Sequence, residues 1–373
     1  MRTRKKKRIA PLRHLLLVLS LLVILLQRAL RGNRALMRRL STGFVRPILQ
    51  RLGEKSAAVP YSVAELLMAL AVLLLLLYIL FGIERTRRRG SFFLRLYRFL
   101  ITLLSFAAAV YAGFCVLWGV YYYGDDFVGQ SGLRSEPVST EQLSLVTGYF
   151  AGLANTCADK VPRGADGVCA SDRDSILDRS VQLYAALEGD FPCLAGTPLR
   201  AKPVRLSKVM SYVDFTGFFF PFTGEANVNM DCPPAYFAAT VAHELAHQRG
   251  VAKEQEANFV AVIACLRSAD PEFVYSASLL AYTHLPNALY TADRAAWEQI
   301  SASLSAGVRA DLQAERDYWQ RFQTPVREVS NTVYESFLQS YDQTLGLKSY
   351  GACVDLLVNY YYESVASTYG GNP

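Results

Sequence analysis

The sequence contains few histidines and no CxxC cysteine pair. Only four of its 373 residues are histidine. Structural zinc clusters are commonly built from paired cysteines, so this class of site is not expected. The apolar stretches near the N-terminus also lack intramembrane charge apart from Glu65 at an end. A transporter is therefore a weak interpretation, because transport pathways are typically marked by buried charges.

Basic residues are concentrated at one end of the chain. The first 124 residues hold 21 of the 39 Lys and Arg residues and only three acids. The basic charge thus belongs to the most apolar segment, which points to a membrane surface. We expect a lipid bilayer as a partner and no nucleic acid.

Residues 1–124 contain three apolar stretches, at about 10–30, 63–83 and 99–121. A transmembrane helix needs about 20 apolar residues, so the second and third stretches qualify. The first qualifies only if its flanking arginines snorkel, and a signal peptide is the alternative. No small-residue cleavage site follows Leu26, which favours an uncleaved helix. The sequence predicts two to three transmembrane helices.

The distribution of Lys and Arg predicts the orientation in the membrane. The basic N-terminus and the basic residues 84–98 both favour the cytoplasm. Three spans then place residues 125–373 outside, as the extracytoplasmic domain of a multi-pass protein of the cell membrane. The loop between the first two spans is also basic, against this rule, and an interfacial amphipathic helix is one explanation for it.

Six of the seven cysteines lie in residues 125–373. An even number suits disulfides in an oxidising compartment. Cys157 and Cys169 flank a polar loop and are the expected pair, with buried free thiols as the alternative.

Residues 125–373 read as a mostly α domain with a small β-sheet, an α+β fold. Residues 202–231 are rich in Val, Phe and Tyr and predict two or three strands. Helices are expected over residues 139–158, 171–187, 234–249, 253–266, 272–283, 293–322, 331–345 and 351–366.

The stretch "HELAH" places two histidines four residues apart. On a helix, His243 and His247 project from one face, the spacing for two ligands of one Zn²⁺ ion. Glu244 follows the first histidine and can act as general base, taking a proton from water that attacks a carbonyl. Asp231 is the expected N-cap of this helix, and Gly250 its expected stop.

A third zinc ligand is expected from Glu254 or Glu256 on the next helix. These residues lie about 200° apart around a helix, so only one can face the metal. Glu254 shares its face with small residues and with Asn258, which could hydrogen-bond a ligand histidine. We prefer Glu254 and keep Glu256 as the alternative.

The stretches "HELAHQRG" and "EQEANFVA" resemble zinc metallopeptidases of the gluzincin type. In those enzymes a glutamate from the next helix completes the ligand set, which maps to Glu254. The metzincin pattern fits less well, because Lys253 stands at its third-ligand position and no methionine follows Met230. The whole layout resembles the bacterial domain of unknown function 3810 family, which implies a membrane-anchored zinc peptidase with a zincin-like domain but supplies no substrate.

Three further residues are substrate-binding candidates. Asn227 and Asn229 alternate with apolar residues on a strand that could pair with an extended substrate, and His284 could donate to the oxyanion. The expected function is a zinc metallopeptidase acting on cell-envelope proteins or peptides. The alternative is a non-catalytic membrane sensor or scaffold with a structural zinc site.

Overall fold

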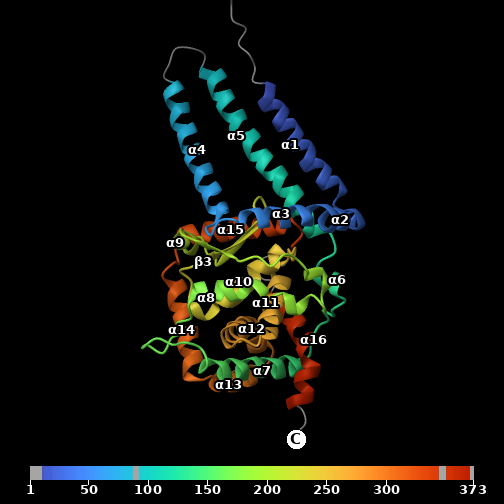
Figure 1. Cartoon of the computed structure of the whole chain (residues 1–373), viewed down its shortest axis with the longest axis vertical. Helices are drawn as coiled ribbons and strands as arrows, with labels where there is room; N and C mark the ends of the chain where they lie inside the picture. Colours follow the sequence, from blue (N-terminus) through green and yellow to red (C-terminus); the bar gives the residue numbers. More distant parts are fainter. Residues whose placement is uncertain (1–10, 87–91, 344–349, 370–373) are drawn as a thin grey trace, which may run out of the picture. The chain divides into compact units, whose positions relative to one another are not determined.

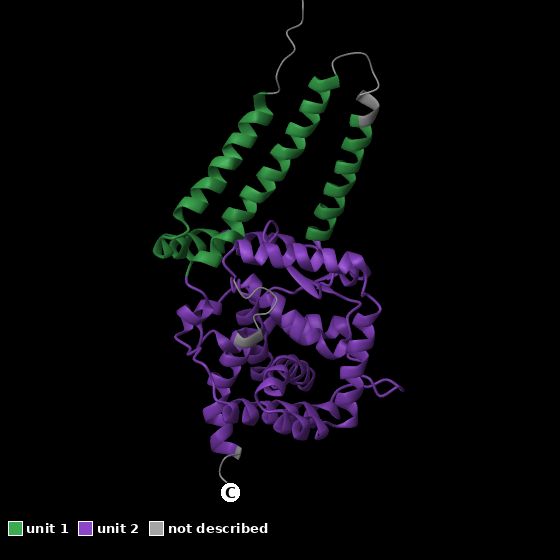
Figure 2. Cartoon of the chain, turned by 180° about the vertical axis from the view of Figure 1, so that it is seen from behind, with its two compact units in different colours: residues 1–47, 63–124 green, residues 48–62, 125–373 purple. Residues whose placement is uncertain are grey.

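The computed structural model describes residues 11–86, 92–343 and 350–369. The protein is mostly helical with one three-stranded sheet, as predicted (Figure 1). The chain divides into two compact units. Unit 1 lies within residues 1–47 and 63–124, and unit 2 lies within residues 48–62 and 125–373 (Figure 2).

Unit 1 contains three helices that are long and apolar enough to cross a membrane: Pro11–Leu30, Val63–Gly82 and Phe92–Gly119. They indicate a membrane protein. The elements that begin in this unit are α1 (Pro11–Leu30), α2 (Arg34–Leu40), the π-helix η1 (Ser41–Val45), α3 (Arg46–Ser56), which continues into unit 2, α4 (Val63–Thr86), α5 (Phe92–Phe114), the π-helix η2 (Cys115–Gly119) and the 3₁₀ turn η3 (Tyr121–Tyr123).

The first and third apolar helices pack against each other. The Arg13 guanidinium donates to the Arg98 carbonyl at 3.1 Å, and the Ser105 hydroxyl donates to the Arg13 carbonyl at 2.8 Å. The third helix begins at Phe92 and not at residue 99 as predicted. Its first turns include Arg95 and Arg98, and the Arg98 carbonyl accepts the hydrogen bond from Arg13 of the first helix.

The basic loop after α1 is helical over α2, η1 and the start of α3. Within unit 1, the Arg31 guanidinium donates to the Tyr123 hydroxyl at 3.1 Å and lies 5.3 Å from the centre of that ring. Arg31, one of the basic residues that follow α1, therefore interacts with an aromatic side chain of the same unit.

Unit 2 is a helical body around a small sheet. Its elements after α3 are α6 (Phe127–Ser131), α7 (Thr140–Ala158), α8 (Arg173–Arg179), the 3₁₀ turns η4 (Ser180–Gln182), η5 (Ala185–Leu187) and η6 (Pro192–Leu194), β1 (Lys202–Val204), α9 (Ser207–Tyr212), β2 (Gly217–Phe220), β3 (Glu225–Asn229), α10 (Pro234–Gln248), α11 (Glu254–Arg267), α12 (Pro271–Ala292), α13 (Arg294–Ala302), α14 (Ala306–Gln320), α15 (Pro325–Ser340) and α16 (Tyr350–Tyr369).

Several predicted helices begin or end elsewhere because side chains cap them. The helix predicted over residues 293–322 is two helices, since Ser305 caps α14 by accepting from the Val308 N–H. The helix predicted over 171–187 ends at Arg179 and continues as 3₁₀ turns. By contrast, α7 matches its predicted range within one residue, and Ser139 and Gln142 form a capping box at its start.

The sheet has the order β1-β3-β2, with β1 parallel and β2 antiparallel to β3. The central position of β3 contradicts the prediction that this strand pairs with a substrate. Asn227 and Asn229 are fully buried. Asn227 accepts from the Ser62 hydroxyl at 2.6 Å, and Asn229 donates to the Ser211 hydroxyl at 2.9 Å. Both asparagines therefore bind other parts of the protein.

Residues 48–62 belong to unit 2 although they precede α4 in the chain. Besides the contact of Ser62 with β3, the buried Lys202 ammonium on β1 donates to the carbonyls of Ser56, at 3.1 Å, and of Val59. An ammonium in the interior needs such partners, so this segment is part of the fold of unit 2.

The core of unit 2 contains α10, α11 and α12, which pack against one another. Both α10 and α11 are rich in buried alanine, with Ala238, Ala242 and Ala246 on one helix and Ala257, Ala261 and Ala264 on the other. Small side chains let two helix backbones come close. This approach brings the start of α11 beside the end of α10.

All seven cysteines are free thiols, so the predicted Cys157–Cys169 disulfide is not formed. Both side chains lie in one apolar cluster. The Cys169 N–H donates to Asp311 at 2.7 Å and its thiol lies 3.3 Å from the Ser171 hydroxyl. These contacts fix Cys169 without a covalent bond.

Candidate metal centre

The "HELAH" residues lie in the last turns of α10. Pro233 is the N-cap residue of this helix. Asp231 is not the cap that the sequence predicted, because its carboxylate accepts from the Tyr318 hydroxyl at 3.0 Å. At the other end the helix stops as predicted at Gly250, whose φ of 90° favours glycine. The turn that follows leads directly into α11.

Both imidazoles are oriented by a hydrogen bond at Nδ1. His243 Nδ1 lies 2.8 Å from the Asn258 side-chain oxygen, and His247 Nδ1 lies 2.6 Å from the Val251 carbonyl. Each acceptor requires a proton on Nδ1, so in the neutral imidazole it is Nε2 that carries the lone pair a metal can use. The two Nε2 atoms face each other at 3.0 Å. The predicted contact of Asn258 with a ligand histidine is present.

Glu254 brings a carboxylate oxygen to the same point. Its Oε2 lies 3.1 Å from His243 Nε2 and 3.7 Å from His247 Nε2. Zinc bonds of about 2.0–2.1 Å in a tetrahedron place ligand atoms about 3.3 Å apart. The observed separations bracket this value, and two imidazoles with one carboxylate are a donor set that zinc accepts. The three side chains therefore fit a zinc ion.

Glu256 faces away from the histidines. Its side chain is 3% exposed, and Oε2 accepts from the Phe127 N–H at 2.8 Å. Burial, together with the nearby Asp126 charge, raises the pKa of Glu256 to about 7. Of the two acids named as third ligands, Glu254 is the one that reaches the site.

The electrostatics of the cluster favour a positive charge at its centre. Burial opposes the charge on His247, but Glu254 outweighs it and raises the pKa of His247 to about 9. Burial likewise opposes ionisation of Glu254, but His247 and the histidine hydrogen bonds hold its pKa well below the usual range. The three side chains offer ligand atoms within 4.8 Å of one another and could hold a cation.

Glu244 is buried beside the cluster, and no hydrogen-bond partner of its Oε2 lies among the described residues. Burial raises the pKa of Glu244 to about 7, against the lowering effect of His243 and His247. Gly217 of β2 packs directly on this carboxyl, since a Cβ there would lie 2.5 Å from Glu244 Cγ and Oε1. The close approach needs glycine.

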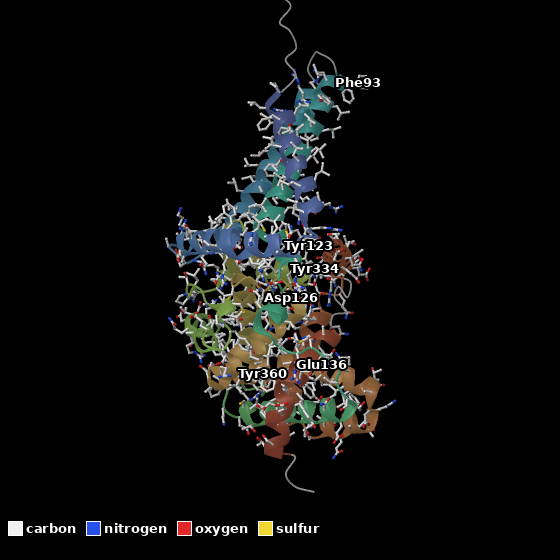
Figure 3. The ribbon with its side chains drawn as sticks, turned by 90° about the vertical axis from the view of Figure 1, so that its right-hand side faces the viewer. Phe93, Tyr123, Asp126, Glu136, Tyr334 and Tyr360 are labelled. Atoms are coloured by element: carbon white, nitrogen blue, oxygen red, sulfur yellow. The ribbon has the colours of Figure 1, made fainter. Side chains whose placement is uncertain are left out.

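Tyr334 is a site residue that the sequence did not reveal. It lies on helix α15 and is labelled in Figure 3. Its hydroxyl donates to Glu254 Oε1 at 2.6 Å. Its ring packs edge-on against Phe215, with centroids 5.3 Å apart. No motif joins Tyr334 to residues 80 positions earlier in the chain, so only the fold shows the contact.

His284 lies in α12 and is 5% exposed. Burial lowers its pKa to about 4, and the charge of His243 adds to this effect. His284 is therefore neutral near pH 7 and close enough to feel His243. It is outside the group of three that could hold a metal, and its predicted part in substrate binding stays a prediction.

The family model described as Protein of unknown function (DUF3810) matches residues 40–358. The chain belongs to this family. No curated protein and no solved structure matches it. The match covers α10, α11 and α15, and so all the residues of the metal centre.

Proposed function

We propose that this protein is a membrane-anchored, zinc-dependent metallopeptidase whose zincin-like domain, in unit 2, lies outside the cytoplasm. The observation that carries the proposal is the convergence of His243 Nε2, His247 Nε2 and Glu254 Oε2 beside the buried Glu244. The described residues supply three ligands to this point and no fourth. Three protein ligands with an open position are typical of catalytic zinc, whereas structural sites are closed.

His243, His247 and Glu254 would hold the ion. When bound, zinc supplies a Lewis acid that polarises a carbonyl and makes water more acidic. Asn258 and the Val251 carbonyl keep the imidazoles in the tautomer that binds a metal. Tyr334 holds the remaining oxygen of Glu254.

Glu244 is the general base. A carboxyl at this position can accept a proton from water and release it again, and burial raises the pKa of Glu244 above its usual value, which favours proton uptake. It takes the proton of the attacking water and delivers it to the leaving amine. Gly217 keeps this carboxyl in place by close packing.

We expect the backbone of the substrate to bind along the edge of β2 that is opposite β3. β2 pairs with β3 on one side, and no other strand among the described residues pairs with it. A peptide can add to such an edge through main-chain hydrogen bonds. Because Gly217 of β2 contacts Glu244, a peptide bound there passes the catalytic carboxyl.

Localisation suggests the class of substrate. The basic residues 84–98 favour the cytoplasm, and the apolar helices α4 and α5 on either side of them then carry unit 2 to the outside. Cell-envelope proteins or peptides are the molecules that an outward-facing peptidase meets.

The proposal is tested with the full chain purified in detergent. We expect one zinc per chain, and cleavage of a peptide library that a chelator abolishes and added zinc restores. Glu244→Gln should keep the zinc and lose activity by about 10²–10⁴-fold. If Glu244→Gln bound zinc and cleaved as fast as wild type, the base assignment would be wrong.

A matched pair of variants tests the ligand assignment. Glu254→Gln should lose zinc, whereas Glu256→Gln, two positions later on α11, should retain it because this carboxyl faces Phe127. One tightly bound zinc with no cleavage of any peptide would favour a membrane sensor or scaffold instead.

A further inference from the structure

Helix α15 carries an exposed aliphatic stripe. Val326, Val329 and Val333 are 56%, 64% and 64% exposed, and their spacing places them on one side of the helix. Two other residues, Ser330 and Asn331, point to the body of unit 2 and hydrogen-bond the chain after α9. Single exposed valines are ordinary, but three on the same side of one helix form an exposed apolar patch.

Helix α9 also carries exposed aliphatic residues. Leu206, its N-cap residue, and Val209 are 55% and 56% exposed, and the basic Arg205 and Lys208 are their neighbours in the sequence. Ser330 of α15 donates to the Val213 carbonyl at 2.8 Å, which ties the two helices together. We call the exposed aliphatic residues of both helices the α9–α15 face: Leu206, Val209, Val326, Val329 and Val333.

Strand β3 connects the α9–α15 face to the residue that precedes the second apolar helix. Asn227 of β3 binds Ser62, and α4 begins at the next residue, Val63. Asn229 of the same strand binds Ser211 of α9. Residues two apart in a strand are separated by about 7 Å. Figure 1 shows α9, β3 and α15 at the same end of unit 2.

We propose that the α9–α15 face rests on the lipid bilayer that α4 crosses. Aliphatic side chains on one face of a helix sink about 5–10 Å into the boundary between headgroups and acyl chains. Arg205 and Lys208 then meet anionic headgroups. The surface is thus covered by lipid, and unit 2 lies on the membrane in addition to being tethered to it.

This placement deepens the proposed function and rests on it. Tyr334 of α15 hydrogen-bonds Glu254, while Val333 beside it is exposed. Val333 and Tyr334 are successive residues of α15, so the helix that rests on the bilayer also contacts the metal centre. The substrates that reach such a site most readily are polypeptides anchored in the same bilayer.

The docking is tested by fluorescence in the full chain. Val209→Cys and Val329→Cys are each labelled with an environment-sensitive nitrobenzoxadiazole dye and reconstituted into phosphatidylcholine–phosphatidylglycerol vesicles. A doxyl group near the headgroup should quench both labels, and a doxyl group near the acyl end should quench them less. Gln299→Cys on α13 is the matched exposed control and should not be quenched. The wild-type chain gives the background from native cysteines.

The outcomes distinguish whether water, lipid or a second copy of the chain contacts the α9–α15 face. Labels that are water-exposed and unquenched by either lipid would overturn the proposal. Labels that are shielded in detergent as well as in vesicles, and unquenched, would show that a second copy of the chain covers the face, which also overturns it. This experiment needs no catalysis, so it stands apart from the test of the peptidase activity.

A second measurement addresses the substrate class. Cleavage of one peptide sequence is compared free in solution and tethered to the vesicle by a lipid anchor. The double variant Val329→Asp/Val333→Asp should lower the ratio of tethered to free cleavage. An unchanged ratio would contradict the substrate class. If wild type cleaves neither form, the proposed function fails while the quenching result still decides the docking.

Discussion

At the scale of single residues, the proposed metal centre depends on side chains that would not themselves bind the ion. The two imidazoles present Nε2 because Asn258 and Val251 hold Nδ1. Glu254 presents one oxygen because Tyr334 holds the other. Such outer contacts commonly set metal affinity as strongly as the ligands do.

We predict that Asn258→Ala lowers zinc affinity by about 10–100-fold. Without the amide oxygen, the His243 ring can turn and its tautomer is no longer fixed. Competition with a fluorescent chelator measures the change. Asn287→Ala is the control, because Asn287 is exposed and bonds only within its own helix in the described contacts. Equal affinities for the two variants would remove Asn258 from the site.

Tyr334→Phe should weaken zinc binding by about tenfold, since a hydrogen bond to a charged group contributes about 1.5–3 kcal/mol. The same chelator competition measures the loss. The exposed Tyr290, changed to Phe, is the matched control. If Tyr334 contributed only through the packing of its ring, Tyr334→Phe would bind zinc with the same affinity as wild type.

Gly217→Ala should reduce peptidase activity while zinc stays bound. The added Cβ would lie 2.5 Å from Glu244 Cγ and Oε1, so the base must move. Metal content and turnover are measured on the same sample. Gly152→Ala is the control, because a Cβ there meets nothing within 4 Å. Loss of zinc together with activity would point to a wider disturbance than the one described.

At the scale of elements, the centre is made by one sharp turn between two buried helices. α10 ends at Gln248 and α11 begins at Glu254. Gly250 between them has a φ of 90°. Together with the alanine-rich contact of the helices, this turn decides that Glu254 reaches the histidines.

We predict that Gly250→Ala destabilises the protein by about 1–2 kcal/mol, the cost of a left-handed conformation for a residue with a Cβ. The midpoint of thermal unfolding, followed by circular dichroism, should fall. Gly152→Ala in helix α7 should not lower it, because alanine favours a helix. A Gly250→Ala protein as stable as wild type would show that the turn relaxes without strain.

Local patterns predicted some of these elements and missed others. The helical spacing of His243 and His247 and the acidic start of α11 are visible in the sequence, because ligand and scaffold lie within a few turns. The strand order is not visible. Asn227 and Asn229 look like edge residues until β1 joins β3 in parallel. Gly217 and Tyr334 come from distant segments, and only tertiary packing brings them to Glu244 and Glu254.

At the scale of the whole molecule, unit 2 contains chain from both sides of a helical hairpin. Residues 48–62 precede α4 and residues from 125 onward follow α5. If both helices cross the membrane, these two parts lie on one side of it. The basic residues of α3 are then on the side of unit 2, against the usual bias.

Labelling of intact cells tests this orientation. Lys55→Cys and Gln299→Cys, one from each part of unit 2, should both react with a membrane-impermeant maleimide, as both positions are exposed. Phe93→Cys, at the first turn of α5 (Figure 3), should react only after permeabilisation. If only Phe93→Cys were labelled in intact cells, the orientation in the membrane would be the opposite of the proposed one.

Residues 48–62, which precede α4, provide the hydrogen-bond acceptors of the buried Lys202 ammonium. This has a consequence for proteolytic removal of the apolar helices. A single proteolytic nick after Gly124 leaves residues 48–62 behind with the bilayer-spanning part. Lys202 would then lose the carbonyls of Ser56 and Val59, and Asn227 would lose Ser62. Cleavage at this point would therefore leave unsatisfied polar groups in the interior of unit 2, so the apolar helices cannot be removed without damage to its fold.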